Sequence, residues 1–305
     1  MTTQELKNKI IEVKKATNTI ILAHTYQEPD IIDVADVTGD SFFLSKKAAE
    51  LKAERVVMCG VRFMAESVKI LSPETETVLP VASATCPMAE QILPERVRKF
   101  KEENPDACVV AYINTTAALK AECDVCVTSS SAIKIVKSLP EKDILFIPDQ
   151  HLGSFVAKKV PEKNIILWDG YCPVHALLTK EDVLRCKKAH PDAVFAVHPE
   201  SPAEVVALAD MVGATSEIIK YAKEQPGKVI IGTERGVVDY LAINEKNGER
   251  FIQLAPEKLC CEDMKKISLE DVYNAIVGDG GESIELPEDL RKKALKSINR
   301  MLELG

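Results

Sequence analysis

The sequence has no apolar stretch long enough to cross a membrane and no recognisable secretory signal. None of its hydrophobic runs reaches the roughly 18 apolar residues that a membrane-spanning helix requires. Residues 1–16, MTTQELKNKIIEVKKA, have the spacing of an amphipathic helix and lack the apolar stretch and cleavage site of a secretory signal. Hydrophobic residues still make up 46% of the 305 residues, which is enough for a substantial core. We therefore expect a folded globular protein in the cytoplasm.

Basic residues are in the minority and form no concentrated patch. Asp and Glu number 47 against 39 Lys and Arg, which gives a net charge of −8. The basic residues lie scattered along predicted helices, as in the pairs Lys46-Lys47 and Lys187-Lys188. A nucleic-acid-binding protein typically concentrates its positive charge on one face. The sequence therefore gives no indication of a nucleic acid or an anionic membrane as a partner.

The cysteines lack the patterns of a disulfide scaffold, a zinc finger or a radical S-adenosylmethionine enzyme. There are nine, and an odd number without a secretory signal argues against a disulfide framework. The CxxC motif formed by Cys123 and Cys126 has no second CxxC or histidine pair at zinc-finger spacing, and no CxxxCxxC occurs. We expect Cys123 and Cys126 to be structural, and Cys59, Cys108 and Cys186 to be buried core residues.

What the chain does have is a regular alternation of β-branched apolar runs with helical patterns. This alternation predicts βαβ units and parallel sheets, and hence an α/β fold. A chain of this length can form two or three small domains or one large one. The choice between these depends on whether the pattern repeats.

Three landmarks recur with nearly one period. From His24 to Tyr112 is 88 residues (112 − 24), and from Tyr112 to His198 is 86 (198 − 112). Three hydroxyl residues in Ser/Thr-containing turns follow at intervals of 88 and 86 residues: Ser41, Ser129 and Thr215. Three cysteines follow at intervals of 86 and 89 residues: Cys86, Cys172 and Cys261. Self-similarity at a fixed period indicates repeated structural units.

The repeat predicts three similar three-layer αβα modules, each with a short parallel sheet. We expect them at residues 1–90, 91–178 and 179–267, with a helical tail at 268–305 that packs back on a module. All three landmark sets lie at or beyond the carboxyl ends of predicted strands, where parallel sheets collect functional groups. We therefore expect the modules to be arranged with pseudo-threefold symmetry around one central active site.

The repeated cysteines have the features of an iron–sulfur site. We expect Cys86, Cys172 and Cys261 to end the third strand of each module and to precede a helix, whose N-terminus favours a thiolate. Three thiolates on one axis suit a [4Fe–4S] cluster with one iron free to act as a Lewis acid, whereas most clusters have four cysteine ligands. Spacing alone leaves a second interpretation open, namely three equivalent packing cysteines.

Polar pairs at the strand ends point to acid–base chemistry. The three pairs, each spaced i and i+2, are His24 with Tyr26, Tyr112 with Asn114, and His198 with Glu200. His198 and Glu200 are able to move protons near neutral pH, and the two tyrosines to donate to a developing oxyanion. The hydroxyl residues are expected to open helices, where backbone N–H groups attract phosphate or carboxylate; helix capping is the alternative role, and both can hold together.

At these residues the sequence resembles the quinolinate synthase family. The matching stretches cover most of the chain: AHTYQ, VTGDS, ATCPMA, VAYINTTA, VTSSSA, PDQHLG, WDGYCPVH, VHPE and CEDMKKISLE. The resemblance implies a pseudo-threefold, three-domain fold around an oxygen-sensitive [4Fe–4S] cluster. It also implies condensation of iminoaspartate with dihydroxyacetone phosphate to quinolinate, with loss of phosphate and water, in NAD biosynthesis. A functional link to L-aspartate oxidase or aspartate dehydrogenase follows from that pathway.

The resemblance also assigns roles to individual residues. It makes Cys86, Cys172 and Cys261 the cluster ligands and Tyr26 an acid–base residue, with Glu200, His198 and Tyr112 as further catalytic groups. The implied substrate-binding residues are His24, Ser41, Tyr112, Ile113, Asn114, Ser129, His175, His198, Pro199, Glu200 and Thr215. The free iron would bind a carboxylate or hydroxyl of the intermediate and assist dehydration.

One departure from the family pattern leaves the third ligand open. Many relatives have Cys-Pro-x-Met there, whereas this chain has Cys260-Cys261-Glu-Asp-Met264. The Cys-x-x-Met spacing selects Cys261, but Cys260 competes, and the CxxCxxC that longer family members carry near this ligand is absent. Two other functions also stay open from the residues: another cluster-dependent dehydratase, and a non-catalytic metal or redox sensor using Cys123 and Cys126.

Overall fold

The computed structural model describes residues 1–51 and 53–305, which form two compact units. The first unit comprises Met1–Cys86 and Cys261–Leu295, and the second Pro87–Cys260 and Lys296–Gly305. Among the described residues, no helix is both long enough and apolar enough to cross a membrane. The chain folds into three sheets, one in the first unit and two in the second.

The sheet of the first unit has five strands in the order β13-β4-β3-β1-β2. Its strands are β1 (Thr19–His24), β2 (Val37–Gly39), β3 (Arg55–Cys59), β4 (Glu76–Leu79) and β13 (Glu282–Ser283). The first four are parallel, and β13, from the tail of the chain, pairs antiparallel with β4. The helices of this unit are α1 (Thr3–Ala16), α2 (Pro29–Val34), α3 (Ser41–Leu51), α4 (Arg62–Leu71) and α13 (Leu269–Val277).

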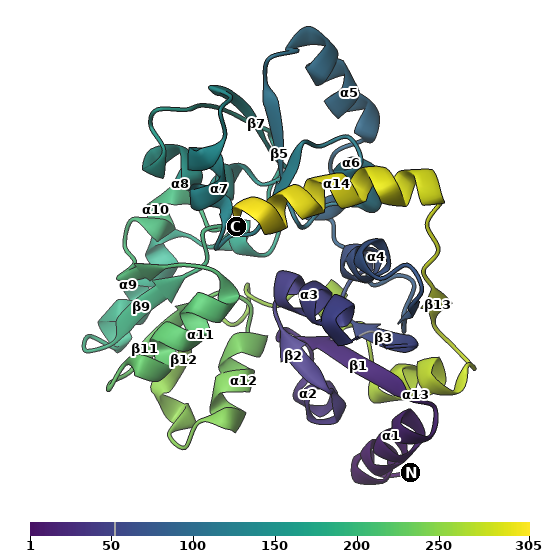
Figure 1. Ribbon diagram of the computed structural model, residues 1–305. Helices are drawn as coiled ribbons and strands as arrows, with labels where there is room; N and C mark the ends of the chain where they lie inside the picture. The colour runs from purple at the N-terminus through teal and green to yellow at the C-terminus, as the bar shows by residue number, and fades with distance from the viewer. Residues whose placement is uncertain (52) are drawn as a thin grey trace. The chain divides into compact units, whose positions relative to one another are not determined.

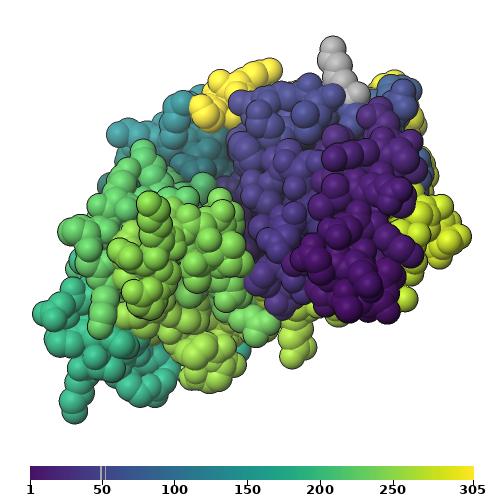
Figure 2. Space-filling model, turned by 90° about the horizontal axis from the view of Figure 1, so that it is seen from below, coloured from purple at the N-terminus to yellow at the C-terminus, as the bar shows by residue number. Residues whose placement is uncertain are grey.

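Helices cover both faces of this first sheet. α1, α2 and α13 contact one another on one face, and α3 packs against α4 on the other (Figure 1). α1 begins with a capping box, in which Thr2 and Glu5 satisfy each other's backbone N–H groups. The core beneath it includes Ile10, Ile21 and Val57, all fully buried, and each such side chain contributes about 1.5–3 kcal/mol by leaving water. The outer side of α1 forms part of the molecular surface (Figure 2).

The second unit holds two four-stranded, all-parallel sheets. One has the order β6-β5-β7-β8, and its strands are β5 (Cys108–Tyr112), β6 (Val125–Val127), β7 (Asp143–Ile147) and β8 (Asn164–Leu167). The other has the order β10-β9-β11-β12, and its strands are β9 (Val194–Val197), β10 (Met211–Val212), β11 (Val229–Gly232) and β12 (Phe251–Gln253).

Helices connect the strands of the second unit at equivalent places. Those of the first of its sheets are α5 (Pro94–Glu103), α6 (Ala117–Lys120), α7 (Ala132–Ser138) and α8 (Gln150–Lys159). Those of the second are α9 (Lys180–Ala189), α10 (Ala203–Val206), α11 (Thr215–Glu224) and α12 (Gly236–Asn244). α5 contacts α6, α7 contacts α8, α9 contacts α10 and α11 contacts α12. The last helix, α14 (Glu288–Leu304), belongs to the first unit up to Leu295 and to the second beyond it.

The three sheets share one topology, which confirms the predicted α/β fold with three short parallel sheets. In each sheet, the second strand of the repeat lies at one edge and pairs with the first strand. The third strand pairs with the other side of the first, and the fourth strand pairs with the third. The sequence predicted that each repeated cysteine follows a third strand, whereas four strands precede it in each repeat. The missed strands, β2, β6 and β10, have two or three residues each, too few for a hydrophobic alternation to be visible.

A lysine–aspartate ion pair recurs in all three repeats and was also missed. The aspartates Asp36, Asp124 and Asp210 accept hydrogen bonds from the backbone of the adjacent first strand, at Ile21, Val109 and Phe195, over 2.7–2.8 Å. Each aspartate also pairs with a lysine from the helix that precedes this first strand. The lysines are Lys14 on α1, Lys101 on α5 and Lys187 on α9. The aspartates are 88 (124 − 36) and 86 (210 − 124) residues apart. In each repeat, the ion pair therefore connects the segment before the second strand to the first strand and to the helix that precedes it.

Candidate functional site

In the first unit, the side chains of His24 and Tyr26 lie together at the end of β1. His24 is the last residue of the strand and is buried. Tyr26 lies in the turn that follows, and its backbone N–H donates to Nδ1 of His24 over 3.1 Å. The two rings meet edge to face, 4.4 Å between centroids. The turn after the strand therefore brings the two predicted side chains together.

The third repeat reproduces this turn with a carboxylate in place of the phenol. His198 follows β9 directly, and its Nδ1 accepts the backbone N–H of Glu200 over 3.3 Å. Pro199 forms the middle of the turn. Tyr112 occupies the corresponding place at the end of β5 in the second repeat.

Three polar side chains surround the Glu200 carboxylate in the second unit. One carboxylate oxygen lies 3.0 Å from Nδ1 of His175 and the other 3.8 Å from Nδ1 of His198, and the Tyr112 hydroxyl also hydrogen-bonds it. Burial alone would raise the pKa of Glu200, but His198, His175 and Tyr112 together outweigh burial and hold the pKa well below its usual range. Glu200 is therefore a carboxylate at neutral pH.

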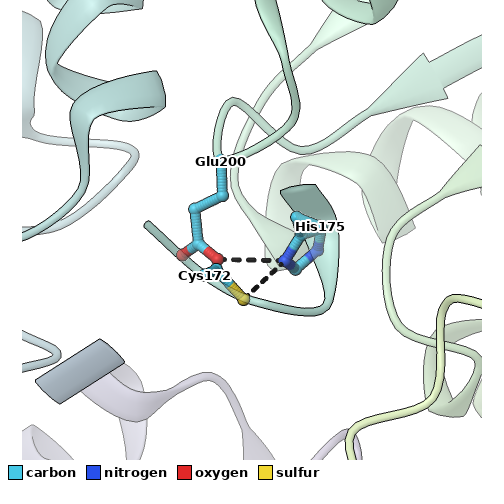
Figure 3. Close-up of side chains that lie close together, drawn as sticks. All are labelled: Cys172, His175 and Glu200. Atoms are coloured by element: carbon cyan, nitrogen blue, oxygen red, sulfur yellow. Dashed lines mark hydrogen bonds and ion pairs between the residues drawn. The ribbon is translucent and has the colours of Figure 1, made fainter. Parts of the chain in front are cut away.

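His175 links this carboxylate to one of the predicted cluster ligands (Figure 3). Its Nδ1 lies 3.3 Å from Sγ of Cys172, and its Nε2 lies 2.9 Å from Oγ1 of the buried Thr233. The rings of His175 and His198 are 5.1 Å apart. The structure thus brings Tyr112, Cys172, His175, His198 and Glu200 together, all of them predicted site residues.

Cys172 is held by its backbone from several sides. Its N–H donates to Oδ2 of Asp149 over 3.0 Å. The amide of Gln91 makes two hydrogen bonds with the backbone of the preceding residue, Tyr171. At Gly170, a side chain would come within 2.6 Å of the Pro148 carbonyl, so this position requires glycine. The loop that presents the Cys172 thiol is therefore fixed on its β7–α8 side.

The loops that carry the three repeated cysteines are anchored alike. A backbone N–H at the start of the helix after the third strand donates to the carbonyl two residues before the cysteine. The three bonds are Arg62 to Ala84, Gln150 to Gly170 and Arg235 to Leu259, at 2.8–2.9 Å. The third bond aligns Cys261, rather than Cys260, with Cys86 and Cys172. All three thiols are partly buried, as is Cys260, so burial does not discriminate between the two candidates.

Two expectations about these cysteines were wrong. They do not end strands, because β4, β8 and β12 stop at Leu79, Leu167 and Gln253 and loops follow. After β4 the next residue is Pro80, which has no N–H to continue the ladder. Each cysteine precedes only a three-residue 3₁₀ helix (Met88–Glu90, His175–Leu177 and Asp263–Lys265). So short a turn has no appreciable dipole, and the proposed helix-end stabilisation of the thiolates has no basis.

The hydroxyl residues divide into two that open helices and one that does not. Ser41 and Thr215 are the first residues of α3 and α11, and both are buried. The cap of α3 is Asp40, whose carboxylate accepts the N–H of Phe43, so Asp40 and not Ser41 caps this helix. Ser129 lies in a turn three residues before α7. The prediction that Ser129 opens a helix was wrong, because Thr128 and Ser131 pair with each other across that turn.

The loop after β5 carries Ile113 and Asn114 and is held by a residue that sequence reasoning missed. Lys120 is completely buried, and its ammonium group donates to the carbonyls of Ile113 (2.8 Å) and Thr115. Lys120 therefore fixes the backbone of this loop at two carbonyl groups. The sequence signal was weak, since Lys120 simply reads as a polar residue on a short helix.

In the first unit, the loop after β1 is hydrogen-bonded to the turn after Cys261. The side-chain amide of Gln27, 1% exposed, donates to the Met264 carbonyl over 2.6 Å. Gln27 follows Tyr26 directly, and Met264 closes the Cys-x-x-Met motif. One buried amide thus connects the His24–Tyr26 turn to the segment after the third repeated cysteine.

Cys123 and Cys126 are structural in their surroundings. Both are buried; Sγ of Cys123 donates to the Leu119 carbonyl over 3.0 Å, and Sγ of Cys126 to Oγ of Ser297 over 3.4 Å. Burial raises the pKa of both thiols, which disfavours the reactive thiolate form. The expected buried character of Cys59 and Cys108 is confirmed, whereas Cys186 is only partly buried.

The donor chemistry of the repeated cysteines fits an iron–sulfur cluster. Cys86 and Cys261 belong to the first unit and Cys172 to the second. Each cysteine lies in an anchored loop, and thiolates are the usual ligands of such clusters. Cys172 also has a histidine and an ionised carboxylate beside it, which are able to act on a substrate bound there.

Comparison with known proteins agrees with these features. The family model described as quinolinate synthetase A protein matches residues 8–303. The quinolinate synthase of Caldicellulosiruptor saccharolyticus is 47% identical over 306 aligned residues, covering 100% of both chains. Those of Clostridioides difficile and Methanoregula boonei are 46% and 44% identical and cover 99% and 98% of both chains. The chain therefore belongs to the quinolinate synthetase A family.

Proposed function

We propose that this chain is a quinolinate synthase of NAD biosynthesis, which condenses iminoaspartate with dihydroxyacetone phosphate and releases phosphate and water. Family membership along nearly the whole chain, with 44–47% identity to quinolinate synthases, makes it an enzyme of this kind. The structural observation that carries the proposal is the cluster of Glu200, His175, His198 and Tyr112 around Cys172. It combines a metal-ligating thiol with proton-transfer groups.

Cys86, Cys172 and Cys261 would hold a [4Fe–4S] cluster. Cys261 is preferred over Cys260 because the backbone bond from Arg235 to Leu259 gives it the register of the other two cysteines. Three protein ligands leave one iron without cysteine, and when bound the cluster supplies a Lewis acid for dehydration. We further propose that the three repeats, at residues 1–90, 91–178 and 179–267 with the tail 268–305, surround one active site with pseudo-threefold symmetry.

The chain's own residues move the protons. Proton transfer in the reaction is assigned to Glu200 and His198, where a carboxylate oxygen of the first lies 3.8 Å from Nδ1 of the second. Tyr26 would act as the second acid–base residue, with His24 supporting its ring. Tyr112 donates to Glu200 and would turn to a developing oxyanion on the substrate.

Substrate binding is assigned to groups at the ends of strands and helices. Ser41 and Thr215 stand at the first positions of α3 and α11, and the N-termini of helices attract phosphate or carboxylate. The remaining contacts are assigned to Ile113, Asn114, Ser129 and Pro199. We place the enzyme in the cytoplasm, supplied with iminoaspartate by L-aspartate oxidase or aspartate dehydrogenase.

The proposal is tested by anaerobic purification, iron and sulfide determination, and a quinolinate assay with freshly generated iminoaspartate and dihydroxyacetone phosphate. The wild type is compared with Cys86→Ser, Cys261→Ser and the matched neighbour Cys260→Ser. We expect a brown, oxygen-labile wild type, loss of cluster and activity in the first two variants, and retention of both in Cys260→Ser.

Other results would identify other functions. Turnover only with another hydroxy acid would indicate a different cluster-dependent dehydratase. Loss of the cluster in Cys260→Ser with retention in Cys261→Ser would overturn the ligand assignment.

A further inference from the structure

Three metal-ligating atoms, all on residues of the second unit, lie close together. They are Sγ of Cys172, Nδ1 of His175 and a carboxylate oxygen of Glu200, all within 4.8 Å of one another (Figure 3). His175 and Glu200 are buried and Cys172 is partly buried. We propose that the cluster-free chain binds one divalent transition-metal ion, with Zn²⁺ as the representative case, through these three residues.

The distances suit a tetrahedral ion. Zn–N and Zn–O bonds of about 2.0 Å and a Zn–S bond of about 2.3 Å at tetrahedral angles separate N from O by about 3.3 Å and N from S by about 3.5 Å. The structure has 3.0 Å from Nδ1 to Oε2 and 3.3 Å from Nδ1 to Sγ. These two separations therefore need to widen by only about 0.2–0.3 Å, and the third, between the carboxylate oxygen and Sγ, is at most 4.8 Å.

The charges balance when the ion is bound. A Zn²⁺ ion with the Glu200 carboxylate and the Cys172 thiolate forms a neutral group, because the thiol proton leaves to solvent on binding. Burying a neutral group costs far less than burying an isolated carboxylate. In the metal-free chain, Glu200 instead depends on hydrogen bonds from His175 and Tyr112.

Surrounding groups orient the ligands as in natural zinc sites. Metal-bound histidines almost always hydrogen-bond through the other ring nitrogen, and here Nε2 of His175 lies 2.9 Å from Oγ1 of Thr233. With the metal on Nδ1, Nε2 carries the proton and donates it to this hydroxyl. Asp149 fixes the backbone of Cys172. Three protein ligands plus one water is the arrangement of an accessible zinc site.

The ion and the cluster would exclude each other, a consequence that rests on the proposed function because both need Cys172. The zinc site itself does not rest on it, since it follows from the second unit alone. A chain loaded with zinc before its cluster would therefore be held in a form that accepts no cluster until the ion is removed.

The test uses the full chain, stripped of iron with a chelator under anaerobic conditions and titrated with Zn²⁺ in a calorimeter and with Co²⁺ in a spectrophotometer. We expect one ion per chain and, for Co²⁺, a thiolate charge-transfer band with the visible bands of tetrahedral coordination. The band should disappear in Cys172→Ser. Even loss of an outer-shell partner typically costs 10–100-fold in metal affinity. Glu200 and His175 are proposed as direct ligands, so Glu200→Gln and His175→Asn should each weaken binding at least about tenfold.

Two controls separate this site from other cysteines. Cys86→Ser removes a proposed cluster ligand and Cys186→Ser removes a partly buried thiol on α9; both should bind Zn²⁺ like the wild type. Glu200→Gln preserves the shape of the side chain, so it reports on the site even if His175→Asn fails to fold. Absence of binding, unchanged affinity in Glu200→Gln, or loss of binding in Cys86→Ser would each overturn the proposal. None of these outcomes depends on quinolinate formation.

Discussion

The Asp149 carboxylate joins the start of α8 to the backbone of Cys172. One oxygen accepts the N–H of Leu152 over 2.7 Å and caps the helix, and the other accepts the N–H of Cys172 over 3.0 Å. Asp149 is completely buried, and burial together with the charge of Glu200 raises the pKa of its carboxyl group. Asp149 therefore positions a proposed cluster ligand at an electrostatic cost.

We expect Asp149→Asn to lower the iron content of the protein strongly and its free energy of unfolding modestly. The amide keeps the shape but retains only one acceptor oxygen, so one backbone N–H loses its partner, at a cost of about 1–3 kcal/mol. We expect a lower urea midpoint and substoichiometric iron after anaerobic reconstitution. Asp192→Asn, at an exposed position, should match the wild type in both. Full iron content in Asp149→Asn would show that Cys172 needs no such support.

Lys120→Met should disturb the loop that carries Asn114. The methionine fills the space of the lysine stem but leaves the carbonyls of Ile113 and Thr115 without their ammonium donor. We expect a loss of about 1–3 kcal/mol in the free energy of unfolding, measured by denaturant titration, and a raised KM for substrate. Lys137→Met, on the exposed side of α7, is the control, and an unchanged KM in Lys120→Met would separate the loop from substrate binding.

The repeat was predictable from the sequence because three chemically distinct landmarks share its period. The same period also contains Asp36, Asp124 and Asp210, so a search for every recurring charged residue would have found the lysine–aspartate pairs. The two- and three-residue strands were not predictable, because tertiary pairing, not local pattern, makes them strands.

The composition of the site was predictable residue by residue, but its contacts were not. The motifs selected Cys172, His175 and Glu200, yet only the fold shows that His175 lies between thiol and carboxylate. Asp149 and Lys120 escaped notice because their roles are contacts to backbone atoms of distant segments. Such contacts leave no spacing signature in a single sequence.

Ionisation of Asp182 should make the free energy of unfolding depend on pH in the acidic range. It caps α9 through Thr179 and pairs with Lys258 at 2.6 Å. Burial opposes ionisation of Asp182, but Lys258 and Thr179 outweigh it and lower the pKa to about 2, against about 3.9 in an unfolded chain. Because the folded pKa is the lower one, its stabilising contribution is present above about pH 4 and is lost as pH falls towards about 2.

Denaturant titrations across that acidic range measure the contribution. We expect the free energy of unfolding of Asp182→Asn to fall less steeply with decreasing pH than that of the wild type, by at most about 1.4 kcal/mol per pH unit. Asp279→Asn, in the exposed turn after α13, should keep the wild-type slope. Parallel curves for Asp182→Asn and the wild type would mean that other carboxylates dominate the acid response.

Tyr26→Phe should separate catalysis from structure in the first unit. The ring keeps its edge-to-face contact with His24 and only the hydroxyl is lost, so stability and iron content should stay at wild-type values. If the phenol moves a proton in the reaction, turnover should fall about 10²–10⁴-fold, the usual contribution of a general acid or base. Tyr273→Phe, on α13 and packed against the core of the same unit, controls for the loss of any tyrosine hydroxyl. A rate in Tyr26→Phe equal to that of Tyr273→Phe would remove Tyr26 from the chemistry and leave the proton transfers to Glu200 and His198.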